Sequence, residues 1–147
     1  NWFLRDWRTV PGVFFTQDAD SRGTGAKEAP EHVLAGEGHS EIIYRQPRND
    51  EELARVLRAA RADGNDGYSW LGNDNWTPRL VREWWGRKGE LLAWLNRPIA
   101  PRNTDMVADA ARYKAYVENG LERDLRRYVC FLEEGRVPGP KTRLPEL

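Results

Sequence analysis

The sequence predicts an α+β fold, in which a small antiparallel sheet near the N-terminus is followed by a mainly helical C-terminal two thirds. Three observations indicate this fold: β-prone runs alternate with glycine-rich turns up to residue 48, an N-cap pattern begins at Asn49, and an apolar seam with helical spacing runs from residue 106 to 132. At 147 residues the chain suits one domain, expected over residues 1–136. Residues 137–147 are proline-rich and predict an extended surface tail.

Short strands and turns are expected in the N-terminal third. Pro11-Gly12 lies between β-prone residues and suits the centre of a type II turn, which predicts a small hairpin. Pro30 is expected to begin a short helix over residues 31–35 that Gly36 ends. The run "SEIIYRQ" at residues 40–46 then predicts a strand.

Residues 49–63 predict the first long helix. Asn49 is the expected N-cap, and Glu52 three residues later resembles a capping box. The expected apolar face of this helix consists of Leu53, Val56, Leu57 and Ala60. Gly64 is expected to end the helix, so the unusual stretch "GNDGYSWLGNDNW" at residues 64–76 becomes the connection that follows it.

Thr77-Pro78 supplies an N-cap and a first-turn proline for the next helix. An unbroken helix to Leu95 would place Lys88 within its apolar stripe, so two helices broken at residues 86–89 are the simpler alternative. Further on, the seam is Met106, Ala110, Tyr113, Val117, Leu121, Leu125, Tyr128 and Leu132. This seam fits one helix of about 30 residues or two helices divided at Asn119-Gly120.

Composition excludes several classes of protein. The longest apolar run is five residues, far below the roughly 20 that a bilayer needs, so no membrane association is expected. Cys130 is the single cysteine, which excludes an intrachain disulfide and a thiolate zinc cluster and favours a reducing, cytoplasmic location. A helical position for Cys130 predicts a buried structural thiol. No motif indicates a cofactor or a resident metal.

Charge is segregated along the chain although the net charge is zero. Residues 1–48, 49–76, 77–103 and 104–147 carry −1, −3, +4 and 0. Of the 23 basic residues 19 are arginine, the side chain best suited to bidentate contacts with phosphate or carboxylate. An acidic segment that contains residues 64–76 therefore precedes a basic segment that contains three tryptophans.

The 64–76 stretch first suggests a calcium loop. Counted from Asp63, however, the loop has Gly67 at its fifth position and Tyr68 where glycine is required, so an EF-hand is excluded. Asn-Asp-Gly and Gly-Asn are good turn formers. Tyr68, Trp70 and Trp76 either cover the core or form an exposed stacking surface for a base or sugar ring.

An acidic-histidine group in the N-terminal third is the candidate catalytic site. Its expected catalytic members are Asp18, Asp20, His39 and Glu41, with His32 nearby. Carboxylates and histidine could bind a divalent ion for phosphodiester hydrolysis. The alternative is that the acidic residues build turns and that both histidines are incidental.

The basic segment 77–103 is the candidate binding surface. Its expected binding residues, with the two tryptophans of the preceding turn, are Arg79, Arg82, Arg87, Lys88, Arg97, Trp70 and Trp76. The Gly86–Gly89 turn would place two cations where a phosphate could meet them. The alternative is that the tryptophans are core residues and that the arginines pair with acidic groups of the same chain.

These features favour a non-catalytic interaction module that binds a nucleic acid or an acidic protein partner. The rival expectation is a small metal-dependent hydrolase or nuclease-like domain that uses Asp18, Asp20, His39 and Glu41. A third possibility is a fragment or subunit of a larger assembly. The sequence leaves open whether the protein is an enzyme.

Overall fold

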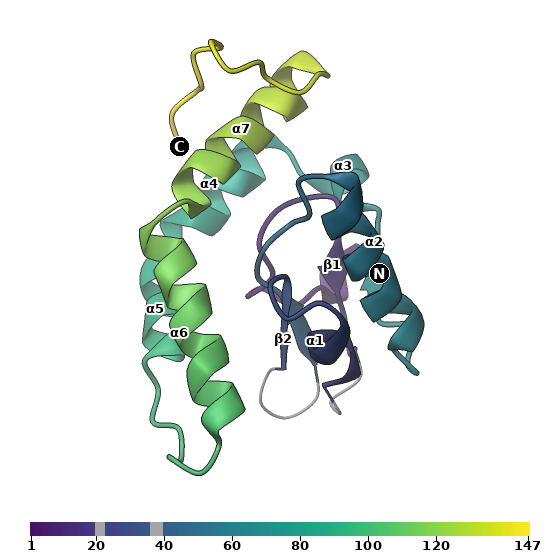
Figure 1. Ribbon diagram of the computed structural model, residues 1–147. Coiled ribbons are helices and arrows are strands. Elements are labelled where there is room, and N and C mark those ends of the chain that lie inside the picture. The colour runs from purple at the N-terminus through teal and green to yellow at the C-terminus, as the bar shows by residue number, and fades with distance from the viewer. Residues whose placement is uncertain (20–22, 36–39) are drawn as a thin grey trace. The chain divides into compact units, whose positions relative to one another are not determined.

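A computed structural model describes residues 1–19, 23–35 and 40–147, and the chain divides into two compact units, Asn1–Asp74 and Asn75–Leu147. The strands lie in the first unit, and the second is helical (Figure 1). The expected α+β fold, with a small antiparallel sheet near the N-terminus followed by helices, is therefore confirmed. The expectation that residues 1–136 form a single domain stays a prediction.

Short elements make up the N-terminal unit. In chain order they are η1 (Trp2–Leu4), β1 (Phe15–Thr16), α1 (Thr24–Glu28), β2 (Val33–Ala35), β3 (Glu41–Ile43), α2 (Asp50–Ala62), β4 (Tyr68–Ser69) and α3 (Gly72–Asn75). Strand β1 pairs antiparallel with β4, with Phe15 opposite Ser69. Strand β2 pairs antiparallel with β3, with Val33 opposite Ile43. The strand expected at residues 40–46 is confirmed in β3.

The turn at Pro11-Gly12 does not form the expected hairpin, because β1 takes β4, more than 50 residues away, as its partner. The Gln46 side chain holds this turn instead. Its amide nitrogen donates to the carbonyl oxygens of Val10 (2.9 Å) and Phe14 (2.8 Å), and its amide oxygen accepts from the Phe14 N–H (3.1 Å). A long-range side chain therefore satisfies the groups that a hairpin ladder would have used.

The helix expected after Pro30 is also wrong, because residues 33–35 form strand β2 and the short helix α1 lies earlier. Val33 and Ile43 pack in an apolar cluster with Phe14, Val56 and other residues of this unit. Val33 and Leu34 are β-prone residues, and pairing with β3 buries both of them.

Helix α2 begins as expected, because the Asn49 side chain accepts the N–H of Glu52 at 2.9 Å. Its buried face differs from the predicted one. Val56 and Ala59 are buried, whereas Leu57 is 36% exposed. The buried face is therefore centred on Val56 and lies nearer to Ala59 than the predicted stripe, and Ala59 packs in the apolar cluster beside α1.

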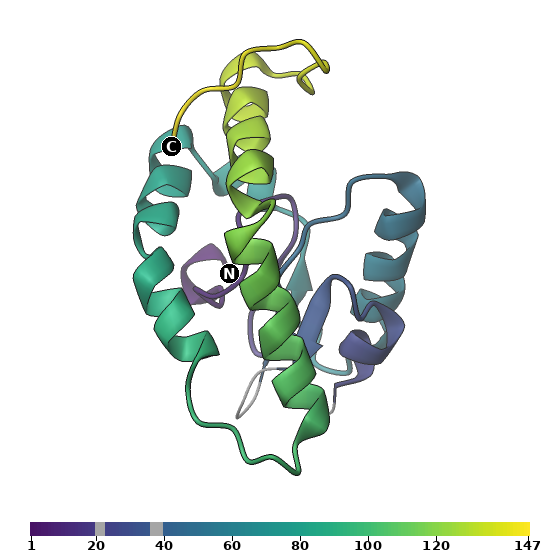
Figure 2. The same cartoon turned by 60° about the vertical axis from the view of Figure 1, so that its left-hand side comes forward.

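Four helices make up the second unit: α4 (Pro78–Gly86), α5 (Lys88–Leu95), α6 (Thr104–Glu118) and α7 (Leu121–Glu134). Helix α4 packs against α7 and α5 packs against α6, while residues 96–103 connect α5 to α6 at one end (Figures 1 and 2). Thr77 caps α4 as expected by accepting the N–H of Leu80 at 3.2 Å. Within the described residues, no helix combines the length and the apolar character that crossing a membrane requires.

The chain is broken into separate helices at both places where the sequence left one or two helices open. Helix α4 ends at Gly86 and α5 begins at Lys88, so the two-helix alternative holds there. Helices α6 and α7 are separated at Asn119 and Gly120, and Gly120 has a φ of 122° that favours glycine. The break between α4 and α5 leaves Lys88 exposed instead of within an apolar stripe.

The predicted seam of α6 and α7 is buried at Tyr113, Val117, Leu121 and Leu125. Beyond Leu125 the buried positions are Val129 and Cys130, while Tyr128 is half-buried. A step of four residues, from Leu125 to Val129, continues the spacing of the preceding buried residues. The expected burial of Cys130 is confirmed.

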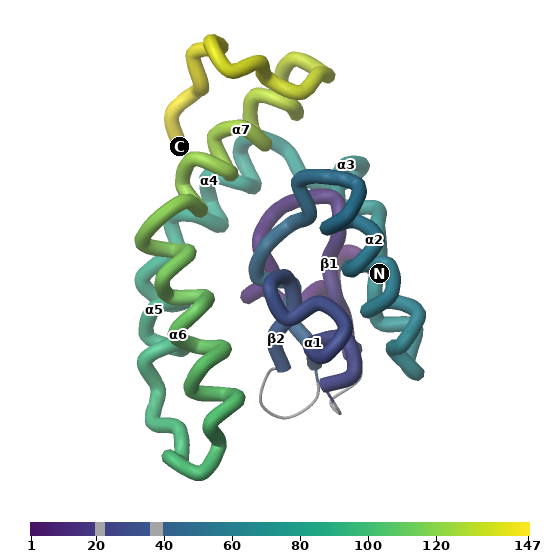
Figure 3. Tube along the Cα trace, viewed as in Figure 1, coloured from purple at the N-terminus to yellow at the C-terminus, as the bar shows by residue number. Residues whose placement is uncertain are grey.

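After α7 the chain reverses at Gly135, which has a φ of 71°. The segment that follows contains no helix or strand and runs back beside α7, so that its end lies next to α4 (Figure 3). Residues 139–142 form a turn in this segment, in which the N–H of Gly139 donates to the Thr142 hydroxyl at 3.0 Å.

Candidate functional site

Glu41, one of the predicted catalytic residues, is completely buried on β3. One carboxylate oxygen accepts the backbone N–H of Gly25 at 2.7 Å, and the other accepts the Tyr68 hydroxyl. Gly25 lies in α1 and Tyr68 lies in β4, so this carboxylate joins three elements of the N-terminal unit. The carboxylate lies against the backbone of α1, since a Cβ on Gly25 would lie 2.1 Å from a Glu41 oxygen. Glu41 therefore has the environment of a structural carboxylate.

Of the other three predicted catalytic residues, the structure describes only Asp18. Asp18 is exposed and has a φ of 43°, which is typical of a turn. Asp20 and His39 lie outside the described residues. His32 is 1% exposed, and its Nδ1 lies 2.9 Å from a backbone carbonyl oxygen. Within the ranges that the structure describes, no three His, Cys, Asp or Glu side chains could hold a metal ion together. The metal-dependent hydrolase remains a sequence-based prediction.

Burial raises the pKa of Glu41 above its usual range. The hydrogen bonds from Tyr68, Gly25 and Ala26 act in the opposite direction, and the nearby negative charge of Asp63 adds to the increase. The net direction is upward because the carboxylate has lost its hydration and its bonds replace only part of it. The folded state therefore binds the Glu41 proton more tightly than the unfolded chain does.

We expect Glu41→Gln to remove a pH-dependent part of the stability. The contribution of protonated Glu41 is fully present below the unfolded pKa and is lost as the pH rises through the higher folded pKa. Glutamine carries no charge, its amide oxygen can accept the Gly25 N–H, and its NH2 group can donate to the Tyr68 hydroxyl oxygen, which reverses the direction of that bond. Urea unfolding between about pH 4 and pH 8 should therefore show the variant gaining on the wild type as the pH rises. Glu31→Gln, at a largely exposed side chain, is the control. A difference that does not change with pH would contradict this assignment.

The 64–76 stretch begins with a turn at residues 64–67 and continues into β4 and α3. The Asp63 carboxylate accepts the backbone N–H groups of Asn65 (3.3 Å) and Gly67. A Cβ on Gly67 would lie 2.5 Å from the Gln17 carbonyl oxygen, so glycine is needed for close backbone approach. Hydrogen bonds within the turn therefore occupy the carboxylate that first suggested a ligand loop.

The aromatic residues of this stretch have different environments. Tyr68 is half-buried and its hydroxyl bonds Glu41, Trp76 is 5% exposed, and Trp70 is 68% exposed. Of the two predicted binding tryptophans, Trp70 presents its ring to solvent and Trp76 presents almost none. Trp76 therefore covers the core, whereas Trp70 forms exposed surface.

The arginines of the basic segment make ion pairs at the surface of the helical unit. Arg79 pairs with Glu83, and Arg87 lies 2.7 Å from Glu90. Arg82, on α4, lies 3.7 Å from a glutamate of α7. Exposed pairs of this kind contribute about 0–1 kcal/mol. A phosphate can therefore replace these carboxylates at low cost.

Two further cations of the segment lie on tryptophan rings. The Lys88 ammonium is 4.4 Å from the centre of the Trp85 ring, and the Arg97 guanidinium is 4.0 Å from the centre of the Trp94 ring. Trp84 is 8% exposed and is a core residue, as the alternative interpretation expected. Trp85 and Trp94 are half-buried and thus combine an aromatic face with a cation.

The Lys88–Trp85 pair lines a cavity of about 440 Å³ that we call the basic pocket. Its other charged lining residues are Arg123 and Arg126 of α7 together with Glu118 and Glu122. Val117 and Leu92 form its apolar part. Three cations, two carboxylates, an aromatic ring and apolar carbon atoms therefore surround one opening, with a net charge of +1.

Sequence reasoning missed Arg123 and Arg126. They lie on the polar side of α7 at positions i and i+3, a spacing that places them on one helix face. That spacing was available as a signal, but only the packing of α4 against α7 brings this face to Lys88. The charge runs alone gave residues 104–147 a net charge of 0 and hid this local basic group.

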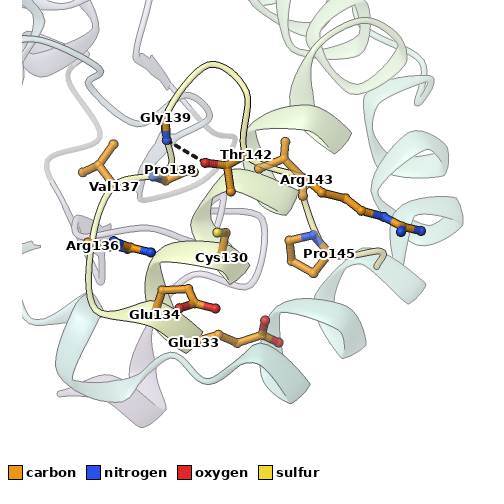
Figure 4. Close-up of a pocket in the computed structure, with 11 residues that line it drawn as sticks. Cys130, Glu133, Glu134, Arg136, Val137, Pro138, Gly139, Thr142, Arg143 and Pro145 are labelled. Atoms are coloured by element: carbon orange, nitrogen blue, oxygen red, sulfur yellow. Dashed lines mark hydrogen bonds between the residues drawn. The ribbon is translucent and has the colours of Figure 1, made fainter.

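A second cavity, of about 460 Å³, lies between α7 and the C-terminal segment (Figure 4). Cys130 lies in its wall, and its charged lining residues are Glu133, Glu134, Arg136 and Arg143. Two negative and two positive groups leave this cavity without a net charge. It therefore offers less selectivity for a charged ligand than the basic pocket does.

The division into two units coincides with the segregation of charge. The N-terminal unit holds nine basic and thirteen acidic residues, whereas the helical unit holds fourteen basic and ten acidic ones. The helical unit therefore carries +4. Comparisons with protein-family models, with curated proteins and with solved structures found no match, so the geometry is the basis for any functional argument.

Proposed function

We propose that this protein is a non-catalytic interaction module whose helical unit binds single-stranded nucleic acid through residues 77–103, together with Arg123 and Arg126. The observation that supports this most is the basic pocket, in which Lys88 lies over the Trp85 ring in a cavity that both arginines line. Cations provide contacts to phosphate and an aromatic ring provides a surface for a base. A cavity of about 440 Å³ has room for one nucleotide, whereas a duplex would not enter it.

The charge of the helical unit supports the same proposal. Phosphate contacts dominate the affinity of nucleic-acid-binding proteins, and the unit has an excess of four positive charges. Arg87 lies between α4 and α5, and Lys88 is the first residue of α5; both side chains are exposed. Arg123 is exposed at the first turn of α7. A nucleic-acid strand with regularly spaced phosphates can contact several of these groups at once.

An acidic protein is the other partner class that the charges allow. Carboxylates would pair with the same cations, but they would make no use of the Trp85 ring. Nucleic acid is therefore the better match, and polyglutamate serves as the competing probe. Equal or tighter binding of polyglutamate would replace the nucleic acid by an acidic protein in this proposal.

We expect the full chain to bind a fluorescent single-stranded oligonucleotide in an anisotropy titration, with an affinity that falls steeply with salt. The double variant Arg87→Ala/Lys88→Ala should bind more weakly. Its plot of log affinity against log salt should flatten by roughly 1.4, since each lost phosphate contact removes about 0.7 for a single strand.

The matched control is Arg58→Ala/Arg61→Ala, which removes two exposed arginines from α2 of the N-terminal unit. This control should leave the slope unchanged. Absence of wild-type binding at low salt, or equal losses in the two double variants, would refute the proposal.

A further inference from the structure

The segment after α7 is held on the helical unit by arginine side chains. Arg82 of α4 donates two N–H groups to the Glu146 carbonyl oxygen, at 3.1 and 2.9 Å. Arg126 of α7 donates to the carbonyl oxygens of Pro145 (2.8 Å) and Leu144 (3.0 Å). Three consecutive backbone carbonyls therefore occupy two guanidinium groups.

Both arginines belong to the surface that we propose for nucleic acid. Arg82 is one of the binding residues predicted from the basic segment, and Arg126 lines the basic pocket with Lys88. The Nε and Nη2 groups of each guanidinium already donate to the chain itself. A phosphate that makes a bidentate contact with these two groups must displace a backbone carbonyl first.

We propose that residues 144–147 act as an autoinhibitory strap that competes with nucleic-acid phosphates for Arg82 and Arg126. This inference rests on the proposed function. Each strap carbonyl is a neutral acceptor, whereas a phosphate is charged and accepts the paired N–H groups of arginine in a stronger, bidentate arrangement. The strap therefore lowers the affinity of the surface without closing it.

The path of the segment makes such a displacement feasible. Residues 136–147 contain no helix or strand, and most of them are exposed. A second anchor, from Arg127 to the Pro138 carbonyl oxygen at 3.3 Å, lies before the turn at residues 139–142. The last residues can leave the arginines while this anchor and the turn keep the segment near α7.

The first test compares the full chain with a chain that ends at Arg143. Without the strap, the affinity for the single-stranded oligonucleotide should rise about fivefold or more, since the Arg82 and Arg126 donors become free. The deletion also removes the Glu146 charge, so Glu146→Gln in the full chain is the matched control. That control changes the charge and keeps the carbonyl, and we expect at most a twofold rise, about what one exposed charge contributes.

A second variant tests the strap in the full-length chain, so that a folding defect in the shortened chain does not affect the result. Thr142→Ala removes the hydroxyl that accepts the Gly139 N–H and so loosens the turn that directs the strap toward Arg126. This variant keeps every charge. It should also bind the oligonucleotide more tightly than the wild type does, by a smaller factor than the deletion.

A third measurement follows strap release directly. If oligonucleotide and strap compete, binding must expose the strap, because linkage between the two is reciprocal. Trypsin should then cut after Arg143 faster when the oligonucleotide is present, and the same addition should not accelerate cleavage in Arg87→Ala/Lys88→Ala.

The outcomes separate the two proposals. If neither the full nor the shortened chain binds the oligonucleotide, the proposed function fails, and the strap with it. If both bind with affinities that differ no more than Glu146→Gln differs from the wild type, the binding function stands and the strap is refuted. Protection of Arg143 from trypsin by the oligonucleotide would also refute the strap.

Discussion

Gly72→Ala is expected to lower the free energy of unfolding by about 3 kcal/mol, because the new methyl group would overlap a backbone that cannot easily move. A Cβ at Gly72 would lie 1.9 Å from the Gly12 carbonyl oxygen and 2.8 Å from the Val13 carbonyl oxygen. The Gly72 N–H also donates to the Val13 carbonyl at 2.9 Å. Any shift that relieves the overlap would break this bond.

Gly64→Ala provides the matched control, in the same stretch of the chain. A Cβ at Gly64 has no atom within 4 Å. The change should therefore alter the stability by about 0.5 kcal/mol or less, as for other surface substitutions. Urea unfolding followed by circular dichroism measures both variants, and equal losses at the two glycines would contradict the close approach at Gly72.

Helix starts could be predicted from the sequence because their causes are local. Asn49 and Thr77 each accept an N–H three residues later, and neither bond depends on the rest of the fold. The breaks near Gly86 and Gly120 stayed open alternatives, because the residues around them do not decide by themselves whether the helix stops. Glycine allows a break there, but tertiary packing decides whether the helix stops.

Strand β1 could not be predicted in the same way, because its partner β4 is more than 50 residues away in the sequence. Strand β1 has two residues and pairs with β4 across most of the N-terminal unit. Such a short strand has no alternation to read, and its position depends on contacts such as those of Gln46 with the turn at Pro11-Gly12. The hairpin error arose where the distant strand β4 overrode local turn chemistry, and the helix error arose where pairing with the nearby strand β3 overrode the helix-start signal of Pro30.

The candidate site was predictable in part. Arg87 and Lys88 could be identified because a basic segment and its flanking glycines are visible in the sequence itself. The contribution of α7 depends on helix packing, and so do the hydrogen bonds that connect Arg82 to the C-terminal segment. A charge pattern identifies which segment is basic, but only the fold determines which other residues share its surface.

Leu125→Ala is the second change for which we expect a large effect. Leu125 is 1% exposed on α7, in line with the buried Leu121 and Val129. Removing its side chain leaves a cavity and should cost about 2–5 kcal/mol. Val107→Ala, at a residue that is 44% exposed on α6 of the same unit, is the control and should cost well under 1 kcal/mol.

Leu125→Ala and Gly72→Ala together also test whether residues 1–136 unfold as one domain. The two changes lie in different units, Leu125 in the helical one and Gly72 in the N-terminal one. In a single cooperative domain, each change lowers the one transition that all probes report. If the units unfold independently, each variant shifts only the transition of its own unit, and the other keeps its wild-type midpoint. Tryptophan fluorescence and circular dichroism that coincide in both variants would support the single domain, whereas separate midpoints would show that the basic helical unit unfolds independently of the acidic N-terminal one.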